Sequence, residues 1–167
     1  MERRDPPAGV QQVAVVLEGL GAQFQPQHLS EPAPTAAAAA QALGVPVAAI
    51  ANSVVFTTDA GPVLVMVSGA HRADPLVLSS LVGVNEMRPA AAAQVRAWTG
   101  QPVGGVAPVG HPSPLRTLVD VELAHFPSVW CGAGDPQWML RTSYAELLRI
   151  TAGEAAEVGD LAPPEAS

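Results

Sequence analysis

Residues 48–67 read AAIANSVVFTTDAGPVLVMV, two runs rich in β-branched residues on either side of the polar segment 58–62. Such runs favour strands, and Asp-Ala-Gly-Pro between them is typical of a turn, so the stretch predicts a β-hairpin. Its first strand carries Asn52 and Ser53 among residues that a sheet would bury. Because an unpaired buried amide costs about 1–3 kcal/mol, Asn52 either has hydrogen-bond partners or faces a cavity.

Segments with helix and strand patterns lie on both sides of this hairpin, but they do not alternate regularly as βαβ units. This order predicts an α+β domain. Helices are expected over residues 9–21, 35–44, 75–83, 90–100 and 144–150, the last behind the capping box Ser143-Tyr-Ala-Glu146. Further strands are expected near residues 23–28, 85–88, 117–121, 128–131 and 138–141. The folded domain is predicted to span 9–155. Residues 1–8 and 156–167 are rich in proline and charge and are predicted to be flexible termini.

Composition and charge narrow the class of protein. The chain has 167 residues, 49% of them apolar, which suits one compact domain. The sequence contains no apolar run long enough to span a membrane and no secretory leader pattern, so we expect a cytoplasmic protein without membrane contact. The net charge is −7 and all the basic residues are arginines, so any nucleic acid is expected to be bound weakly and locally. The single Cys131 argues against a disulfide or a structural zinc site.

The stretch GGVAPVGH, residues 104–111, is the strongest local motif. Glycines let a ligand touch backbone N–H groups directly, so Gly104, Gly105 and Gly110 are candidates for an anion cradle or an oxyanion hole. The alternative is that these glycines and prolines only form a tight turn, which explains the same sequence equally well. The spacing fits neither a P-loop nor a dinucleotide-binding fingerprint. His111 after the loop is a candidate acid, base or hydrogen-bond donor, or a structural histidine.

Other reactive residues form no recognisable set. Ser53 and Ser68 lack the context of a nucleophile elbow, which argues against a serine hydrolase. Glu122 and His125 are half of a carboxylate-bridged metal motif, so we expect no metal and no cofactor. Asp120 and Glu122 are two apart on an expected strand and would share one face.

Five segments together resemble the YbaK/prolyl-tRNA-synthetase-associated family of aminoacyl-tRNA deacylases. They are PTAAAAAQALGVPVAAIANSVVF (34–56), VLVMVSGAHRAD (63–74), TGQPVGGVAPVGHP (99–112), TLVDVEL (117–123) and VWCGAGDPQWMLRTSYAELLRIT (129–151). The resemblance implies a mixed, largely antiparallel, barrel-like sheet surrounded by helices, with a pocket beside the glycine loop. It also implies hydrolysis of the ester that links a wrong amino acid to tRNA, and therefore contact with the acceptor end of an aminoacyl-tRNA.

The resemblance also suggests roles for particular residues. Backbone amides of Gly104, Gly105 and Val106 would hold the oxyanion, and the terminal ribose hydroxyl of the tRNA would help to position the attacking water. His111 and Asn52 complete the expected catalytic set. The residues expected to bind substrate are Ser53, Ser68, Gly69, Arg72, Pro108, Gly110 and Asp120.

Position 52 departs from the pattern of the family, whose better-known members carry a lysine there. Asparagine can donate and accept hydrogen bonds but supplies no charge. A non-catalytic module that binds an aminoacyl group or an amino acid is therefore the alternative to a deacylase, and a plain structural partner protein is a third reading. The edited amino acid stays open among alanine, serine, threonine and smaller non-protein residues. The oligomeric state stays open too, a homodimer included.

Overall fold

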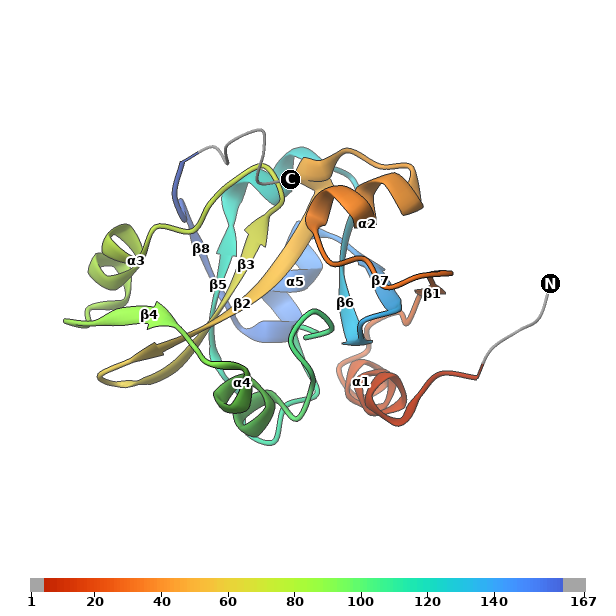
Figure 1. Ribbon diagram of the computed structural model, residues 1–167, viewed down its shortest axis with the longest axis horizontal. Coiled ribbons are helices and arrows are strands. Elements are labelled where there is room, and N and C mark those ends of the chain that lie inside the picture. Colours follow the sequence, from red (N-terminus) through yellow and green to blue (C-terminus); the bar gives the residue numbers. More distant parts are fainter. Residues whose placement is uncertain (1–4, 161–167) are drawn as a thin grey trace.

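The computed structural model describes residues 5–160 as one sheet with helices around it (Figure 1). The helices are α1 Ala8–Gly19, α2 Ala36–Leu43, α3 Pro75–Val82, α4 Ala92–Thr99 and α5 Tyr144–Thr151, with 3-10 turns η1 Val47–Ala49 and η2 Val121–His125. The strands are β1 Pro26–His28, β2 Ile50–Thr58, β3 Gly61–Ser68, β4 Met87–Pro89, β5 Arg116–Asp120, β6 Val129–Asp135, β7 Trp138–Thr142 and β8 Glu154–Ala156.

The predicted hairpin is β2 and β3, paired from Ala51↔Ser68 to Thr58↔Gly61. It lies at the centre of the sheet, whose order is β1-β7-β6-β2-β3-β5-β8, with β4 also on β2. Four strand pairs are antiparallel and three are parallel. The α+β class with a mixed, largely antiparallel sheet is thus confirmed.

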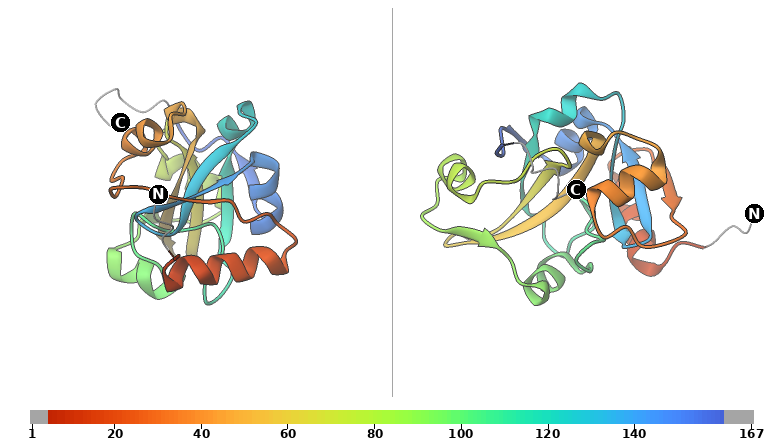
Figure 2. Two further views of the ribbon diagram at one scale, coloured as in Figure 1. Left: turned by 90° about the vertical axis from the view of Figure 1, so that its right-hand side faces the viewer. Right: turned by 45° about the horizontal axis from the view of Figure 1, so that its top comes forward.

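Alternation along the hairpin divides the core between the two faces of the sheet. Val55 and Leu64 point into the cluster formed with α1 and α5, whereas Phe56 and Val63 point into the cluster formed with α3. Helix α2 packs its alanines on the half of the sheet that contains β7. The two views in Figure 2 show α2 and α5 on opposite sides of the sheet. The first half of β2 therefore has α2 over one face.

Capping residues in the sequence correctly predicted where three of the helices begin. Thr35 caps α2, Asp74 caps α3 and Ser143 caps α5, each accepting a backbone N–H through its side chain. The expected continuation of the strand at 117–121 is wrong, because Asp120 ends β5 and Glu122 lies in η2. Asp120 and Glu122 consequently do not share a strand face.

The described chain continues as packed structure past the predicted boundary at residue 155. Strand β8 pairs in parallel with β5, and Val158 is buried. The Arg72 N–H donates to the Asp160 carbonyl. At the other end Ala8 already belongs to α1, and residues 1–4 and 161–167 lie outside the described range. No helix within residues 5–160 is long and apolar enough to cross a membrane.

Candidate functional site

Asn52, Ser53, Gly104 and Val106 meet at one cavity of about 100 Å³. The sheet side of this cavity is completed by Ile50, Ala51, Gly132 and Met139. The opposite side is the entry to α2, with Ala33, Pro34, Thr35 and Ala39. The site therefore forms where the first half of β2 passes between the start of α2 and the glycine loop. None of its lining residues has an ionisable side chain.

The Asn52 side chain is available to a ligand. It is half-buried, and within residues 5–160 it has no side-chain hydrogen bond. Ser53 is also half-buried, and its hydroxyl lies 3.4 Å from the Met66 Sδ, a weak acceptor. Of the two alternatives for Asn52, the structure favours the one in which the amide faces a cavity.

Of the three backbone N–H groups predicted to form the cradle, two have no acceptor in the described structure and one is already hydrogen-bonded. The Gly105 N–H donates to the Pro102 carbonyl at 3.0 Å, and the Gly105 carbonyl accepts from the Gly134 N–H at 2.8 Å. Gly105 therefore supplies no free donor, which corrects the predicted cradle of three amides. Gly104 N–H and Val106 N–H have no acceptor in the part of the chain that the structure describes.

Glycine is required at each of these positions of the loop for a different physical reason. A Cβ on Gly105 would lie 2.6 Å from the Asp135 carbonyl carbon, so the β6–β7 turn excludes a side chain there. Gly104 has open space around its Cβ position but a φ of +89°, a conformation that favours glycine. Gly110, with φ +90°, packs against Val13 and Gln101. The loop thus combines a tight contact with the β6–β7 turn at Gly105 and a positive-φ turn at Gly104, which lines the cavity.

Four predicted substrate-binding residues lie elsewhere. The fully buried Asp120 accepts the Ser68 N–H at 3.0 Å and lies 2.8 Å from the His71 Nδ1, so it anchors the end of β3. The Ser68 hydroxyl donates to the Ala48 carbonyl. A Cβ on Gly69 would meet the Val47 carbonyl oxygen at 2.4 Å. Arg72 is exposed, and none of the four lines the cavity.

Pro108, Gly110 and His111 line a different hollow, between α1 and α5. The His111 Nε2 lies 2.8 Å from the Ala107 carbonyl oxygen. Burial lowers the pKa of His111, and the hydrogen bond to Ala107 offsets part of that effect. His111 and Asn52 thus line different hollows of the described structure, and the catalytic role of His111 stays a prediction.

The pKa of His111 has a consequence for stability. The unfolded imidazole gains its proton near its ordinary pKa of about 6.5, whereas the folded ring resists protonation, so the unfolded state binds more protons below that pH. Stability should therefore fall as the pH drops below about 6.5. Urea unfolding at about pH 7.5 and 5.5 should show a smaller loss for His111→Gln than for the wild type. Equal losses would show that His111 is not the group responsible.

Sequence reasoning missed several residues of the cavity. Thr35 was expected only to begin a helix, and its hydroxyl does accept the Ala38 N–H at 3.1 Å, but it also lines the site. Gly132 and Met139 lie on strands whose sequences give no sign of a cavity. Cys131 is buried, and burial raises its pKa to about 12, so it is no nucleophile at neutral pH.

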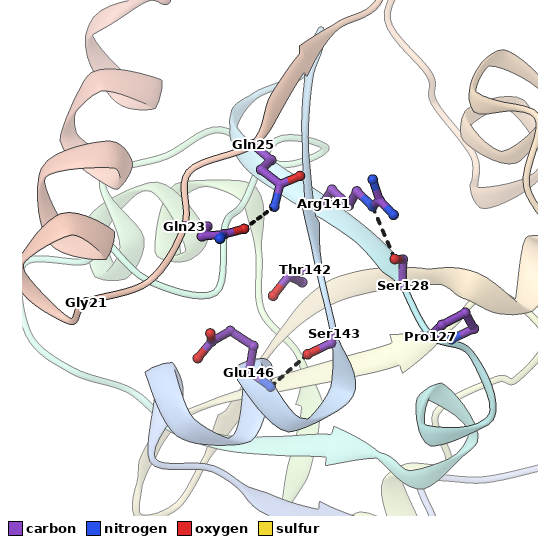
Figure 3. A pocket seen from close by; sticks show the side chains of 9 residues that line it. All are labelled: Gly21, Gln23, Gln25, Pro127, Ser128, Arg141, Thr142, Ser143 and Glu146. Atoms are coloured by element: carbon purple, nitrogen blue, oxygen red, sulfur yellow. Dashed lines mark hydrogen bonds between the residues drawn. The ribbon is translucent and has the colours of Figure 1, made fainter.

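A separate polar hollow of about 500 Å³ lies at the end of β7 (Figure 3). Gln23, Gln25 and Thr142 line it, and Arg141 donates to the Ser128 hydroxyl there at 3.1 Å. Figure 3 also shows Ser143 at the start of α5, accepting the Glu146 N–H. None of the residues predicted to act on substrate lies in this hollow.

The aminoacyl-tRNA editing domain family model matches residues 30–150, which include every residue of the candidate cavity. The chain belongs to this family. Within it, the chain is 33% identical over 122 residues to the proline–tRNA ligase of Nitratidesulfovibrio vulgaris strain Hildenborough, covering 67% of this chain and 21% of that ligase. A proline–tRNA ligase of Latilactobacillus sakei is 28% identical over 128 residues, covering 71% of this chain and 22% of the ligase.

Solved structures support the same assignment. The crystal structure of a proposed trans-editing enzyme for prolyl tRNA synthetase has a TM-score of 0.88 and 35% identity, over 93% of this chain and 99% of that one. A hypothetical protein matches with a TM-score of 0.82 and 30% identity, over 89% and 99% of the two chains. This editing domain thus spans about a fifth of the length of the ligases that it resembles, and nearly all of the two structures.

Proposed function

We propose that this editing domain acts in trans as an aminoacyl-tRNA deacylase, hydrolysing the ester of a small mischarged amino acid. The observation that carries the proposal is that Asn52, Gly104 and Val106 line one cavity, and that the Asn52 side chain and the other two backbone N–H groups have no hydrogen-bond partner in the described structure. Membership of the family supports the same reading. Cytoplasmic location follows from a substrate that takes part in translation.

Ester hydrolysis places negative charge on the carbonyl oxygen when water adds to the carbonyl carbon. Donors fixed in advance at that position lower the barrier without the need for a charged side chain. In the proposed mechanism the amides of Gly104 and Val106 and the side-chain amide of Asn52 donate to this oxyanion. Collapse breaks the bond to the ribose oxygen, which leaves with a proton, so free amino acid and tRNA are released. The terminal ribose hydroxyl helps to position the water.

The cavity favours small, uncharged side chains. Its volume of about 100 Å³ is smaller than the roughly 150 Å³ of an engineered cavity that binds benzene. The lining lacks any ionisable side chain, so a charged substrate side chain would lose its hydration without gaining a partner. Alanine, serine, threonine and smaller non-protein residues all fit this description.

A second candidate function is a binding module that has lost hydrolysis. The observation in its favour is the neutral Asn52 at the position where the resemblance implies a lysine. Such a module would be stabilised thermally by an aminoacyl ester or an amino-acid analogue and would show no turnover.

The experiment is deacylation of tRNAs charged with alanine, serine, threonine or proline. We expect release of free amino acid from at least one of the small mischarged substrates, faster than spontaneous hydrolysis. Release should be slower with Asn52→Ala. No turnover on any charged tRNA would overturn the deacylase proposal, and ligand-dependent stabilisation in that case would favour the binding module.

Ionic contacts with the tRNA phosphates should contribute little to the binding of tRNA. The net charge of −7 opposes broad phosphate binding. In the described structure Arg116 and Arg149 are already paired with Glu154 and Glu146. If about two phosphates are neutralised, kcat/KM should fall by no more than about 20-fold between roughly 50 and 200 mM salt. A loss of several hundred-fold in initial-rate measurements would contradict this local contact.

A further inference from the structure

An apolar hollow of about 240 Å³ lies between α1, residues 108–115 and α5, and it shares no lining residue with the candidate site. Val16 comes from α1, Leu20 follows the last residue of that helix, and Ile150 comes from α5. Leu115 and Val109 complete most of its apolar wall. Its volume exceeds the roughly 150 Å³ of an engineered apolar cavity that binds benzene, so a small aromatic ring can fit.

His111 lines this hollow, and one of its two ring nitrogens has no hydrogen-bond partner in the described structure. A carbonyl oxygen can only accept, so the 2.8 Å contact with Ala107 requires the proton of a neutral His111 to be on Nε2. The Nδ1 then carries a lone pair, and it has no partner in the region that the structure describes. Burial lowers the pKa of His111, which keeps the ring neutral at physiological pH.

The two other polar side chains that line the hollow already donate their hydroxyl protons to backbone carbonyls. The Thr117 hydroxyl donates to the Leu115 carbonyl at 2.9 Å, and the Thr151 hydroxyl donates to the Leu147 carbonyl at 2.6 Å. The hollow therefore offers hydrogen-bond acceptors but no side-chain donor, and His111 is its only ionisable residue. An uncharged ligand loses the least hydration on entering this hollow, and a donor that it carries can pair with the His111 Nδ1.

We propose that this hollow is a second binding site, for a small neutral molecule that has an apolar ring or chain and one O–H or N–H donor directed at the His111 Nδ1. Apolar contact supplies most of the affinity, and the single hydrogen bond supplies the orientation. The site is independent of the deacylase proposal, because none of the residues that hold the oxyanion lines it. Its link to the candidate site is the His111–Ala107 hydrogen bond within the same loop.

The test is an NMR titration of the full chain with phenol, and with anisole as the matched probe in which a methyl ether replaces the O–H. Phenol should shift the backbone amide signals of Gly110, His111, Leu115 and Thr151 saturably, with a Kd on the order of 1 mM. Anisole should bind about 3- to 10-fold more weakly, since it lacks the donor.

Two variants separate the apolar contribution from the hydrogen bond. His111→Phe keeps a ring but removes the acceptor, so phenol and anisole should bind with equal affinity. Leu115→Trp should fill the hollow and abolish the binding of both. The wild-type comparison needs no variant to fold: the absence of saturable shifts, shifts centred on other residues, or equal affinity for the two probes would overturn the proposal.

Discussion

Replacing Asn52 by alanine is expected to lower kcat/KM for deacylation about 100-fold, because removal of one preorganised oxyanion donor costs about 100- to 1000-fold in comparable sites. The melting temperature should stay nearly unchanged, since the half-buried Asn52 side chain has no hydrogen bond within residues 5–160 that folding would lose. The measurement is the initial rate of amino-acid release from the best substrate, together with thermal unfolding of both proteins.

Ser53→Ala is the matched control on the adjacent residue. Ser53 lines the same cavity, but its hydroxyl is directed at the Met66 sulfur. Its removal should change kcat/KM by less than about 3-fold, the effect of losing one weak interaction. If Ser53→Ala were as slow as Asn52→Ala, the effect would come from disturbance of β2 and not from the Asn52 amide.

Asn52→Lys separates the two candidate functions. An ammonium group in this cavity adds an electrostatic contribution to oxyanion stabilisation that the amide lacks. In a deacylase the variant keeps or raises the rate of the wild type. In a binding module the wild type is inactive, and the appearance of turnover in Asn52→Lys alone would identify the missing charge as the reason.

The fold could be predicted where local signals were strong. The β2–β3 hairpin and the three capped helices follow from β-branched runs, turn residues and capping residues. Strand β8 was missed because Glu154–Ala156 has no strand propensity of its own. It is a strand because its backbone pairs in parallel with β5, a partner more than thirty residues earlier in the chain.

The candidate site could be predicted only in part. Asn52 was identified because a polar side chain among β-branched residues needs either hydrogen-bond partners or a cavity. In the structure Asn52 lines a cavity. His111 lines a different hollow from Asn52, because closeness in sequence to a glycine loop does not decide which side of the loop a side chain occupies. The sequence also cannot distinguish a glycine required by φ, such as Gly104, from one required by a neighbouring backbone, such as Gly105.

The second large effect concerns Gly105. In Gly105→Ala the new Cβ would lie 2.6 Å from the Asp135 carbonyl carbon and 2.8 Å from the Pro136 nitrogen, both backbone atoms that no rotamer change can move. The free energy of unfolding should fall by about 3 kcal/mol, typical of overpacking against rigid neighbours. In a domain of this size that loss lowers the melting temperature by roughly 6–12 °C.

Gly44→Ala is the control, because Gly44 has a φ of +69° at the end of α2 and open space around its Cβ position. It should cost only about 1 kcal/mol, the conformational penalty without a clash. A steric role for Gly105 requires the larger loss of stability and a reduced rate that recovers as the temperature is lowered. If Gly105→Ala instead melted with the wild type and had lost all deacylation, Gly105 would contact the substrate, and its N–H would have to leave the Pro102 carbonyl during the reaction.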